Sequence, residues 1–327
     1  MAVLVTGATG FLGSHIARKL VEKGEKVKIL LRKSSKTANI DNLEAERIYG
    51  DVTDLDSFKS AIKGCDTLFH TAGFVSFRKK DHQKMQDINV GGTINAMKAA
   101  LDAGVSKVVY TSSVAAIGVD PDGGIANEET KYTLESEGIT YLNTKYHGEK
   151  EALKFVKDGL PLVIVNPSVV IGPGDIYLSS TAFIQWYCKK KFPGYMDGTM
   201  NIVDVEDVAD GHLLAAEKGK IGQRYILANT DLTINELFDM LQRLTGISRP
   251  KMKIPYTFAF ITAYLVERIL GFSFPNYSTM DVDSVKLSKY KWFVDSSKAE
   301  RELGYKKSNI EESVNKTVDW FKENGYL

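Results

Sequence analysis

Short apolar runs alternate with longer amphipathic segments through the first half of the chain. The short runs are bounded by glycine or charged residues and predict buried strands, whereas apolar residues spaced three or four apart predict helices. Because strands alternate with helices, the pattern predicts a parallel sheet with right-handed crossovers and helices on both faces. The predicted strands are Ala2–Thr6, Val27–Leu31, Arg47–Tyr49, Thr67–His70, Lys107–Thr111 and Leu162–Val165, and the predicted helices are Phe11–Lys23, Leu55–Ile62, Lys84–Ala103 and Ile139–Lys157.

The alternation of predicted strands and helices ends at Gly172, after which aromatic and turn residues become frequent. Strand and helix signals return only briefly, and a capping box that begins at Thr233 predicts the start of a further helix. We therefore expect an α/β fold that combines a Rossmann-type doubly wound parallel sheet with a smaller, mostly helical substrate-binding lobe. The expected Rossmann domain comprises residues 1–172, with 199–228 returning to it, and the expected lobe comprises residues 173–198 and 229–327.

The longest apolar stretch, residues 256–265, is followed closely by Glu267 and Arg268. It is too short to span a bilayer. We interpret it as a buried or lid helix, with contact to a membrane surface as the less favoured alternative.

Composition narrows the function classes. The formal net charge is +1, so no global field recruits nucleic acid, and the basic run at residues 189–191 is interpreted as a solvated loop. Cys65 and Cys188 lack metal-ligand spacing and favour a reducing compartment, with neither disulfides nor a metal site. No basic segment precedes the first strand, so we expect no signal peptide and a cytoplasmic protein.

Three glycines follow the first predicted strand and lead into the first predicted helix. Gly7 permits a tight turn, Gly10 lets the backbone approach a diphosphate, and Gly13 lets the helix pack against the strand. The helix N-terminus then offers free amides and a favourable dipole to the anion. The strand, the glycines and the helix together predict a dinucleotide-binding loop.

The end of the second strand predicts which dinucleotide is bound. NAD enzymes usually place a carboxylate there for the adenosine ribose, but this chain has Arg32 and Lys33 instead. The planar guanidinium of Arg32 can pair with a 2′-phosphate, so NADP(H) is favoured over NAD(H). Two solvated surface cations are the alternative interpretation.

The third and fourth strands end in further candidate cofactor contacts. Asp51 and Val52 would lie near the adenine, although a turn or helix-capping aspartate is nearly as good an interpretation. His70 is interpreted as structural, and the small residues from Thr71 to Gly73 would allow close approach of the cofactor.

Tyr141 and Lys145 are four residues apart on a predicted helix and therefore share a face. A neighbouring ammonium favours the phenolate, so we expect Lys145 to lower the pKa of Tyr141 from its usual value of about 10. Ser113, after the fifth strand, would hydrogen-bond the substrate oxygen. Tyr146 and Lys150 have the same spacing, but five residues turn a helix by about 500°, so this second pair points away from the first. We assign proton transfer to Tyr141 and Lys145.

These residues together resemble the extended short-chain dehydrogenase/reductase superfamily, within it the dihydroflavonol-4-reductase branch and bacterial proteins described as hopanoid-associated sugar epimerases. The resemblance covers nearly the whole chain and rests on TGATGFLGSH, HTAG, DINVGGT, VVYTSSVAAIG, YLNTKYHGE, NPSVVIGPGD and NIVDVEDVADGH. It implies a Ser113–Tyr141–Lys145 triad and supports Asn89 as a residue that holds the site through a water, with a helix cap as an equal alternative. The cofactor contacts that we expect in all are Gly7, Thr9, Gly10, Phe11, Leu12, Gly13, Arg32, Lys33, Asp51, Val52, Thr71, Ala72, Gly73, Asn89, Thr111, Pro167 and Ser168.

One departure from the superfamily bears on the substrate. Its sugar-nucleotide epimerases usually carry an arginine where this chain has Met200. Many aromatic residues accompany that change, which suits an apolar or polycyclic substrate, although core packing explains them equally well. These aromatic residues are Phe74, Phe77, Tyr177, Phe183, Trp186, Tyr187, Phe192 and Tyr195.

The sequence thus predicts an NADP-dependent reductase of a ketone or aldehyde. A sugar epimerase or dehydratase is the alternative, and a non-catalytic NADP-sensing protein is a minor one. The expected partner is a small carbonyl or alcohol substrate, without nucleic acid or a membrane span, and a homodimer is compatible with the superfamily.

Overall fold

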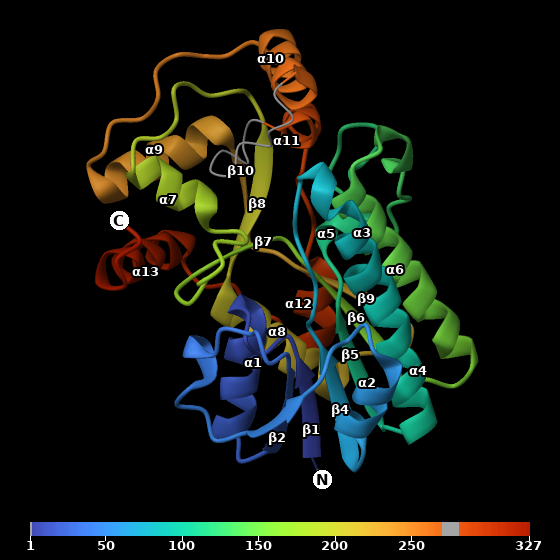
Figure 1. Ribbon diagram of the computed structural model, residues 1–327. Helices are drawn as coiled ribbons and strands as arrows, with labels where there is room; N and C mark the ends of the chain where they lie inside the picture. The colour runs from blue at the N-terminus through green and yellow to red at the C-terminus, as the bar shows by residue number, and fades with distance from the viewer. Residues whose placement is uncertain (1, 270–280) are drawn as a thin grey trace.

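The computed structural model describes residues 2–269 and 281–327 of the chain (Figure 1). Its larger part is built on a seven-stranded sheet in the order β3-β2-β1-β4-β5-β6-β9, and every neighbouring pair is parallel. The predicted Rossmann-type doubly wound sheet is confirmed. The strands are β1 (Ala2–Thr6), β2 (Lys26–Leu31), β3 (Glu46–Tyr49), β4 (Cys65–His70), β5 (Lys107–Thr111), β6 (Leu162–Pro167) and β9 (Arg224–Leu227).

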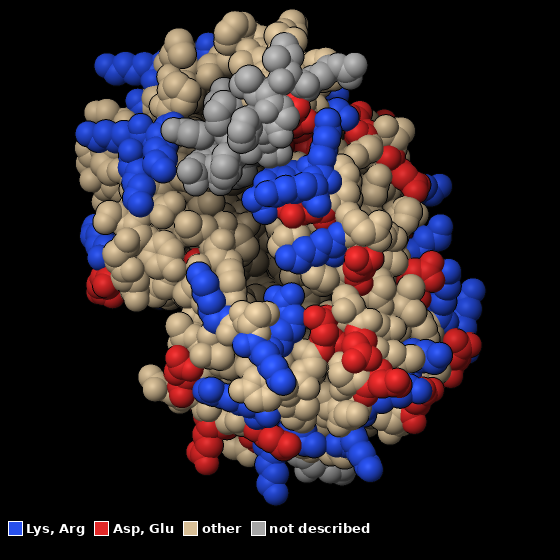
Figure 2. Space-filling model, in the orientation of Figure 1, with Lys and Arg blue, Asp and Glu red and all other residues tan. Residues whose placement is uncertain are grey.

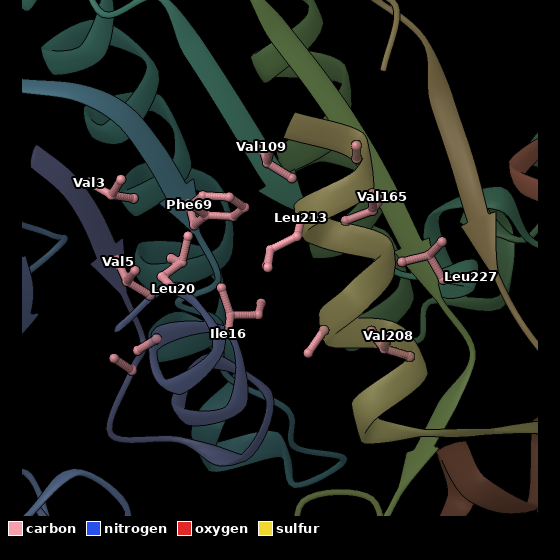
Figure 3. Packing of buried hydrophobic residues seen from close by; sticks show 14 of the residues in the cluster. Val3, Val5, Ile16, Leu20, Phe69, Val109, Val165, Val208, Leu213 and Leu227 are labelled. Carbon is pink, nitrogen blue, oxygen red and sulfur yellow. The ribbon is translucent and has the colours of Figure 1, made fainter. Parts of the chain in front are cut away.

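Helices cover both faces of this sheet because its strands are apolar on both sides. In β1, Val3 and Val5 face one layer of helices, while Leu4 faces the other. Figure 3 shows the first layer, in which Ile16 of one helix and Val208 of another pack toward the strands. This layer contains α1 (Phe11–Glu22), α8 (Val205–Lys218) and α12 (Ser297–Leu303), and the opposite layer contains α2 (Leu55–Ile62), α4 (Thr93–Ala103) and α6 (Thr140–Lys157).

The helix predicted at Lys84–Ala103 is longer and less regular than expected. It begins at His82, with α3 (His82–Met85), and contains a π-helical segment at Gln86–Gly92 before α4. The wider turn coincides with Asn89, whose side chain is directed to a neighbouring loop. A short helix, α5 (Val114–Ile117), follows β5.

The second lobe contains a small sheet of its own, in the order β10-β8-β7. Its helices lie around that sheet and above the larger domain (Figure 1). The lobe's elements are β7 (Val169–Ile171), α7 (Ala182–Cys188), β8 (Thr199–Asp204), β10 (Thr230–Thr233), α9 (Ile234–Thr245), α10 (Tyr256–Ile269), α11 (Val282–Leu287) and α13 (Ile310–Glu323).

The predicted division of the chain between the Rossmann domain and the lobe differs from the structure at two elements, β8 and α12. Strand β8 lies in the segment that was expected to return to the Rossmann domain, but it pairs with β7 and β10; only α8 and β9 of that segment return. Helix α12 was assigned to the lobe, yet it packs against α8 and β9. Local hydrophobic patterns could not reveal these pairings, because they depend on where the chain crosses between the two sheets.

Two buried histidines link the strands to their surroundings. The Nδ1–H of His212 donates to the carbonyl of Val208 at 2.7 Å, and its Nε2 lies 2.8 Å from the Thr111 hydroxyl. His70 Nδ1 lies 2.8 Å from the hydroxyl of Thr6, which supports its structural interpretation. Burial lowers the pKa of His212 to about 4 and, together with the charge of Lys145, that of His70 to about 3.

These two histidines predict acid sensitivity of the fold. Both are neutral in the folded protein, whereas the unfolded chain protonates each below about pH 6.5. Unfolding then takes up protons, so the free energy of unfolding is retained above pH 6.5 and falls as the pH drops toward 4. Each histidine adds up to about 1.4 kcal/mol per pH unit to that slope.

We expect His212→Gln to make the free energy of unfolding depend less steeply on pH, by up to about 1.4 kcal/mol per pH unit. The measurement is urea unfolding between pH 6.5 and 4.5. His147→Gln is the matched control, because His147 is partly exposed and pairs with Glu135 at 2.8 Å. An identical slope in wild type and His212→Gln would contradict the assignment.

Candidate functional site

The glycine loop between β1 and α1 is closely packed. Gly7 has a φ of +73°, and a Cβ there would lie 2.8 Å from the backbone nitrogen of Ala72. A Cβ on Gly13 would lie 2.4 Å from the carbonyl oxygen of Gly7. Gly10 caps the N-terminus of α1 without a side-chain bond, so the first amides of the helix remain available to an anion.

A cleft of about 1190 Å³ runs from this loop, along the carboxyl ends of the strands, into the second lobe. Figure 2 shows the hollow on one face of the molecule, with lysine and arginine side chains at its rim. Its volume exceeds the range of about 300–1,000 Å³ that is usual for one small ligand, so it has room for a cofactor and a substrate. The predicted site residues that line it are Gly7, Thr9, Gly10, Phe11, Leu12, Gly13, Arg32, Asp51, Val52, Thr71, Ala72, Gly73, Thr111, Ser113, Tyr141, Lys145, Pro167 and Ser168.

The structure does not place Lys33 or Asn89 among the residues of the cleft wall. Asn89 is buried, and its side-chain amide forms two hydrogen bonds with the backbone of Phe74. Its Nδ2 donates to the carbonyl at 2.9 Å, and its Oδ1 accepts from the N–H at 2.8 Å. It is neither a helix cap nor a wall residue, and instead it fixes the loop that follows Gly73.

The ribose end of the cleft carries Arg32 rather than a carboxylate. Arg32 is exposed, and its guanidinium forms no ion pair within the part of the chain that the structure describes. Ser35, also on the wall, accepts from the backbone N–H of Arg32 at 3.2 Å. Asp51 lines the cleft, and its carboxylate accepts two bonds of 2.9 Å from Thr53, as expected for a turn aspartate. Its contact with the adenine stays a prediction.

Lys145 is buried beneath the cleft, where its ammonium donates to the carbonyl of Thr111 at 3.0 Å. Burial lowers the pKa of Lys145 to about 8, and the charge of Glu149 opposes that shift. Tyr141 lies one turn earlier on α6, and its ring meets the edge of Phe77 at a centroid distance of 5.9 Å.

The expected direction of the pKa shift of Tyr141 is wrong. Burial raises the pKa of Tyr141, and only an interaction with Ser113 acts in the opposite sense. The expectation considered the ammonium of Lys145 but not the cost of moving a phenolate out of water. The phenol is therefore protonated at neutral pH.

The second Tyr/Lys pair is excluded from the cleft. Tyr146 stacks on Tyr132 at a centroid distance of 4.2 Å, and Lys150 is exposed. The helical phase of α6 thus separates the two pairs as predicted.

A buried network behind Ser113 was missed by the sequence analysis. Glu149 accepts from Asn166 at 2.7 Å and from Arg224 at 3.0 Å, and Asn166 also donates to the backbone carbonyl of Ser113 at 3.0 Å. Glu149 follows Lys145 by four residues on the same helix face, so this spacing was the available signal. The carboxylate of Glu149 compensates both Lys145 and Arg224.

The lobe side of the cleft is largely aromatic. The predicted aromatic residues divide between its wall and the lobe's core: Tyr187 is buried against Phe238, and neither Tyr187 nor Trp186 lines the cleft. Met200 does line it, as do aromatic residues that the sequence analysis did not select. The aromatic wall residues of the lobe are Tyr177, Phe183, Phe192, Tyr195, Phe238, Phe258 and Trp292, and Phe74 and Phe77 line the cleft from the loop that follows β4.

The residues present fit a dinucleotide. The hydroxyls of Ser112 and Ser168 are buried at the cleft and have no hydrogen-bond partner among the described residues. A Cβ at Gly10 would lie 3.1 Å from the carbonyl oxygen of Gly7, so a larger side chain would crowd the loop. Two unsatisfied donors and a free helix N-terminus are features that a bound polar ligand would satisfy.

Comparison with known proteins agrees with this geometry. The family described as NAD dependent epimerase/dehydratase matches residues 3–228. The chain belongs to this family. The predicted resemblance to extended short-chain dehydrogenases/reductases is therefore confirmed.

Several relatives cover the whole chain. It is 38% identical to a "Putative dihydroflavonol 4-reductase" of Synechocystis sp., over 99% of this chain and 95% of that protein. It is 36% identical to "Sterol demethylase protein B" of Methylococcus capsulatus over 100% of both chains. The crystal structure of gox2253 superposes with a TM-score of 0.88 at 38% identity, over 100% of this chain and 99% of that one. A nucleoside-diphosphate-sugar epimerase from Pseudomonas aeruginosa superposes with a TM-score of 0.83 at 26% identity, over 100% and 99%.

The buried network predicts how Lys145 titrates. Glu149→Gln removes the negative charge that favours the ammonium, so the pKa of Lys145 should fall below about 8. The measurement is the rate at which acetic anhydride labels Lys145 as a function of pH, read by mass spectrometry with NMR or circular dichroism as a check of folding.

Lys316, which is exposed on α13 outside this network, is the internal control, and its rate of labelling should be the same in both proteins. Because Glu149→Gln also leaves Arg224 unpaired, Glu149→Gln/Arg224→Met should regain stability while keeping the altered titration. If Lys145 titrates identically in all three proteins, Glu149 has only a structural role.

Proposed function

We propose that the protein is an NADP-dependent reductase that converts a ketone or aldehyde of an apolar, aromatic or polycyclic substrate to the alcohol. The observation that carries the proposal is the position of Ser113, Tyr141 and Lys145, at the point where the glycine-lined part of the cleft meets its aromatic part. A cofactor on the glycine side and a substrate on the aromatic side would meet there.

The residues of the triad take distinct roles. The phenol of Tyr141, kept protonated by burial, donates its proton to the substrate oxygen, and the Ser113 hydroxyl donates a hydrogen bond to the same oxygen. Lys145 holds its charge beside the phenolate that this leaves and offers its remaining donors to the ribose. When bound, the nicotinamide supplies the hydride.

Arg32 supports NADP(H) as the cofactor. Its exposed guanidinium is on the cleft wall, with the hydroxyl of Ser35 nearby and no carboxylate at the end of β2. A 2′-phosphate fits this arrangement, whereas NAD recognition usually relies on an acidic residue at that point.

The wall of the lobe supports an apolar substrate. Aromatic rings and Met200 present surface that favours rings and hydrocarbon over a sugar diphosphate. The names of the two full-length relatives agree, because a flavonol and a sterol are both polycyclic.

A sugar epimerase is the second candidate. The family description and the structural similarity to a nucleoside-diphosphate-sugar epimerase favour it, and Lys84 and Lys191 on the cleft wall could contact a diphosphate. Such an enzyme regenerates its cofactor in each cycle, so it would show no net oxidation of added NADPH.

Tyr141→Phe tests the chemistry. We expect turnover of a carbonyl panel, followed by NADPH absorbance, to fall at least about 100-fold, because general acid catalysis contributes typically 10²–10⁴-fold. NADPH binding, measured by fluorescence titration, should stay within about twofold. Tyr146→Phe is the matched control and should keep its activity. Normal turnover by Tyr141→Phe would refute the assignment, and cofactor-neutral conversion of a sugar nucleotide would favour the epimerase.

Arg32→Asp tests the cofactor. We expect it to weaken NADPH binding at least tenfold and to leave NADH binding equal or stronger, because a carboxylate repels a 2′-phosphate and accepts from a ribose hydroxyl. Lys33→Asp is the matched control, since Lys33 is equally exposed but outside the cleft wall. An unchanged preference for NADPH in Arg32→Asp would remove Arg32 as the selector.

A further inference from the structure

Helix α10 presents an apolar face to solvent. Phe258 is 65% exposed, Ile261 52% and Leu265 45%, and these residues are spaced three and four apart on one side of the helix. Met252, just before the helix, is 58% exposed. Soluble proteins rarely gather large apolar side chains in this way unless the surface binds something.

The opposite side of α10 already has its partner. Ala259 and Ala263 are buried against Val285 of α11, and Tyr256 and Phe260 pack beside them. The helix is therefore docked on the lobe through small residues, and its outer face is not needed to hold it there. The expectation of a buried or lid helix is met on one side only.

Four exposed lysines, residues 189–191 and Lys251, lie on the two segments next to α10, and we call them the lysine rim. The segment that leads into α10 pairs with the segment that follows α7, through the bonds of Tyr195 to Met252 and Ile254. Lysines 189–191 and Lys251 are exposed on these two segments and form no ion pair among the described residues. Figure 2 shows lysine and arginine side chains gathered at the left edge of the lobe, next to uncharged surface.

The size of the face argues against a second protein chain as its occupant. With Tyr264, which is 44% exposed, the face has five apolar side chains about half exposed. An aromatic side chain offers about 150–250 Å² in all and an aliphatic one less, so together they expose on the order of 500 Å². A stable protein interface needs about 800 Å² on each partner. A single apolar helix face bordered by lysines is instead the arrangement of helices that lie in the surface of an anionic bilayer.

The same helix also forms part of the cleft. Ala259, Thr262 and Val266 line the cleft, while Ile261 and Leu265 are exposed outside it. Phe258 lies at the border between the two sides, because it lines the cleft and is still 65% exposed. No helix among residues 2–269 and 281–327 is long and apolar enough to cross a membrane. Contact through α10 would therefore be confined to the surface and would place the aromatic side of the cleft next to the bilayer.

We propose that the exposed face of α10 and its lysine rim dock the protein on the surface of an anionic lipid bilayer. Ile261 and Leu265 enter the acyl boundary and the lysines contact the headgroups. Each lysine near such a surface strengthens binding about fivefold at low salt. This inference is independent of the catalytic assignment, because docking requires no turnover.

Vesicle flotation tests the proposal. We expect the full-length protein to float with phosphatidylcholine vesicles that contain 30% phosphatidylglycerol, and to bind vesicles of phosphatidylcholine alone at least tenfold more weakly. Ile261→Gln/Leu265→Gln should reduce the partition coefficient on the anionic vesicles more than tenfold, because the two aliphatic side chains leave the apolar phase. Binding should also weaken at high salt.

Ile125→Gln/Ile221→Gln is the matched control, since these isoleucines are 52% and 56% exposed but lie outside α10. Both variants should keep the circular dichroism spectrum and the urea-unfolding midpoint of the wild type, which shows that they are folded. The proposal is overturned if the wild type does not float, if it binds neutral vesicles equally, or if both double variants bind alike. It is also overturned if sedimentation shows that the Ile261→Gln/Leu265→Gln variant only dissociates a dimer; that would make this face an interface between copies.

Discussion

The candidate site depends on one buried positive charge. Lys145 lies under the cleft with its ammonium against the carbonyl of Thr111, and desolvation opposes its charge. Removing such a group from water costs several kcal/mol unless other groups compensate it. Glu149, one turn further along α6, provides that compensation and is itself held by Arg224 and Asn166. Since Asn166 also fixes the backbone of Ser113, the electrostatics of the lysine and the position of the serine have a common support.

The interleaved connectivity of the chain has a related consequence. The chain crosses from β6 of the large sheet directly into β7 of the small one, and it returns from β8 to the large sheet through α8. After the lobe's helices it crosses once more, and α12 packs against β9. The lobe is therefore attached at several points around the cleft rather than through one linker. Side chains from both parts therefore line the same cleft, as the proposed transfer between a bound cofactor and a substrate requires.

Local sequence signals were sufficient for the Rossmann domain and for part of the site. The spacing of Gly7, Gly10 and Gly13 and the four-residue spacing of Tyr141 and Lys145 report local geometry, and helical phase alone excluded Tyr146. The pairing of β8, the side of the sheet that α12 covers and the role of Asn89 depend on contacts between distant segments, so a local pattern could not reveal them. The pKa of Tyr141 was misjudged for a similar reason, because the burial that raises it depends on how α6 packs in the fold and not on the spacing along the helix.

The two sides of α10 connect the two proposals, because one side lines the cleft and the other is the proposed bilayer-docking face. Its inner side contributes to the cleft wall on which the proposal of an apolar, poorly water-soluble substrate rests. Such substrates partition into bilayers, where their local concentration greatly exceeds that in water. An enzyme for them gains more from a surface that rests on the bilayer than from a cleft that opens only to solvent. The exposed isoleucine and leucine, which cost solubility in a protein that stays in solution, then have a physical reason to face outward.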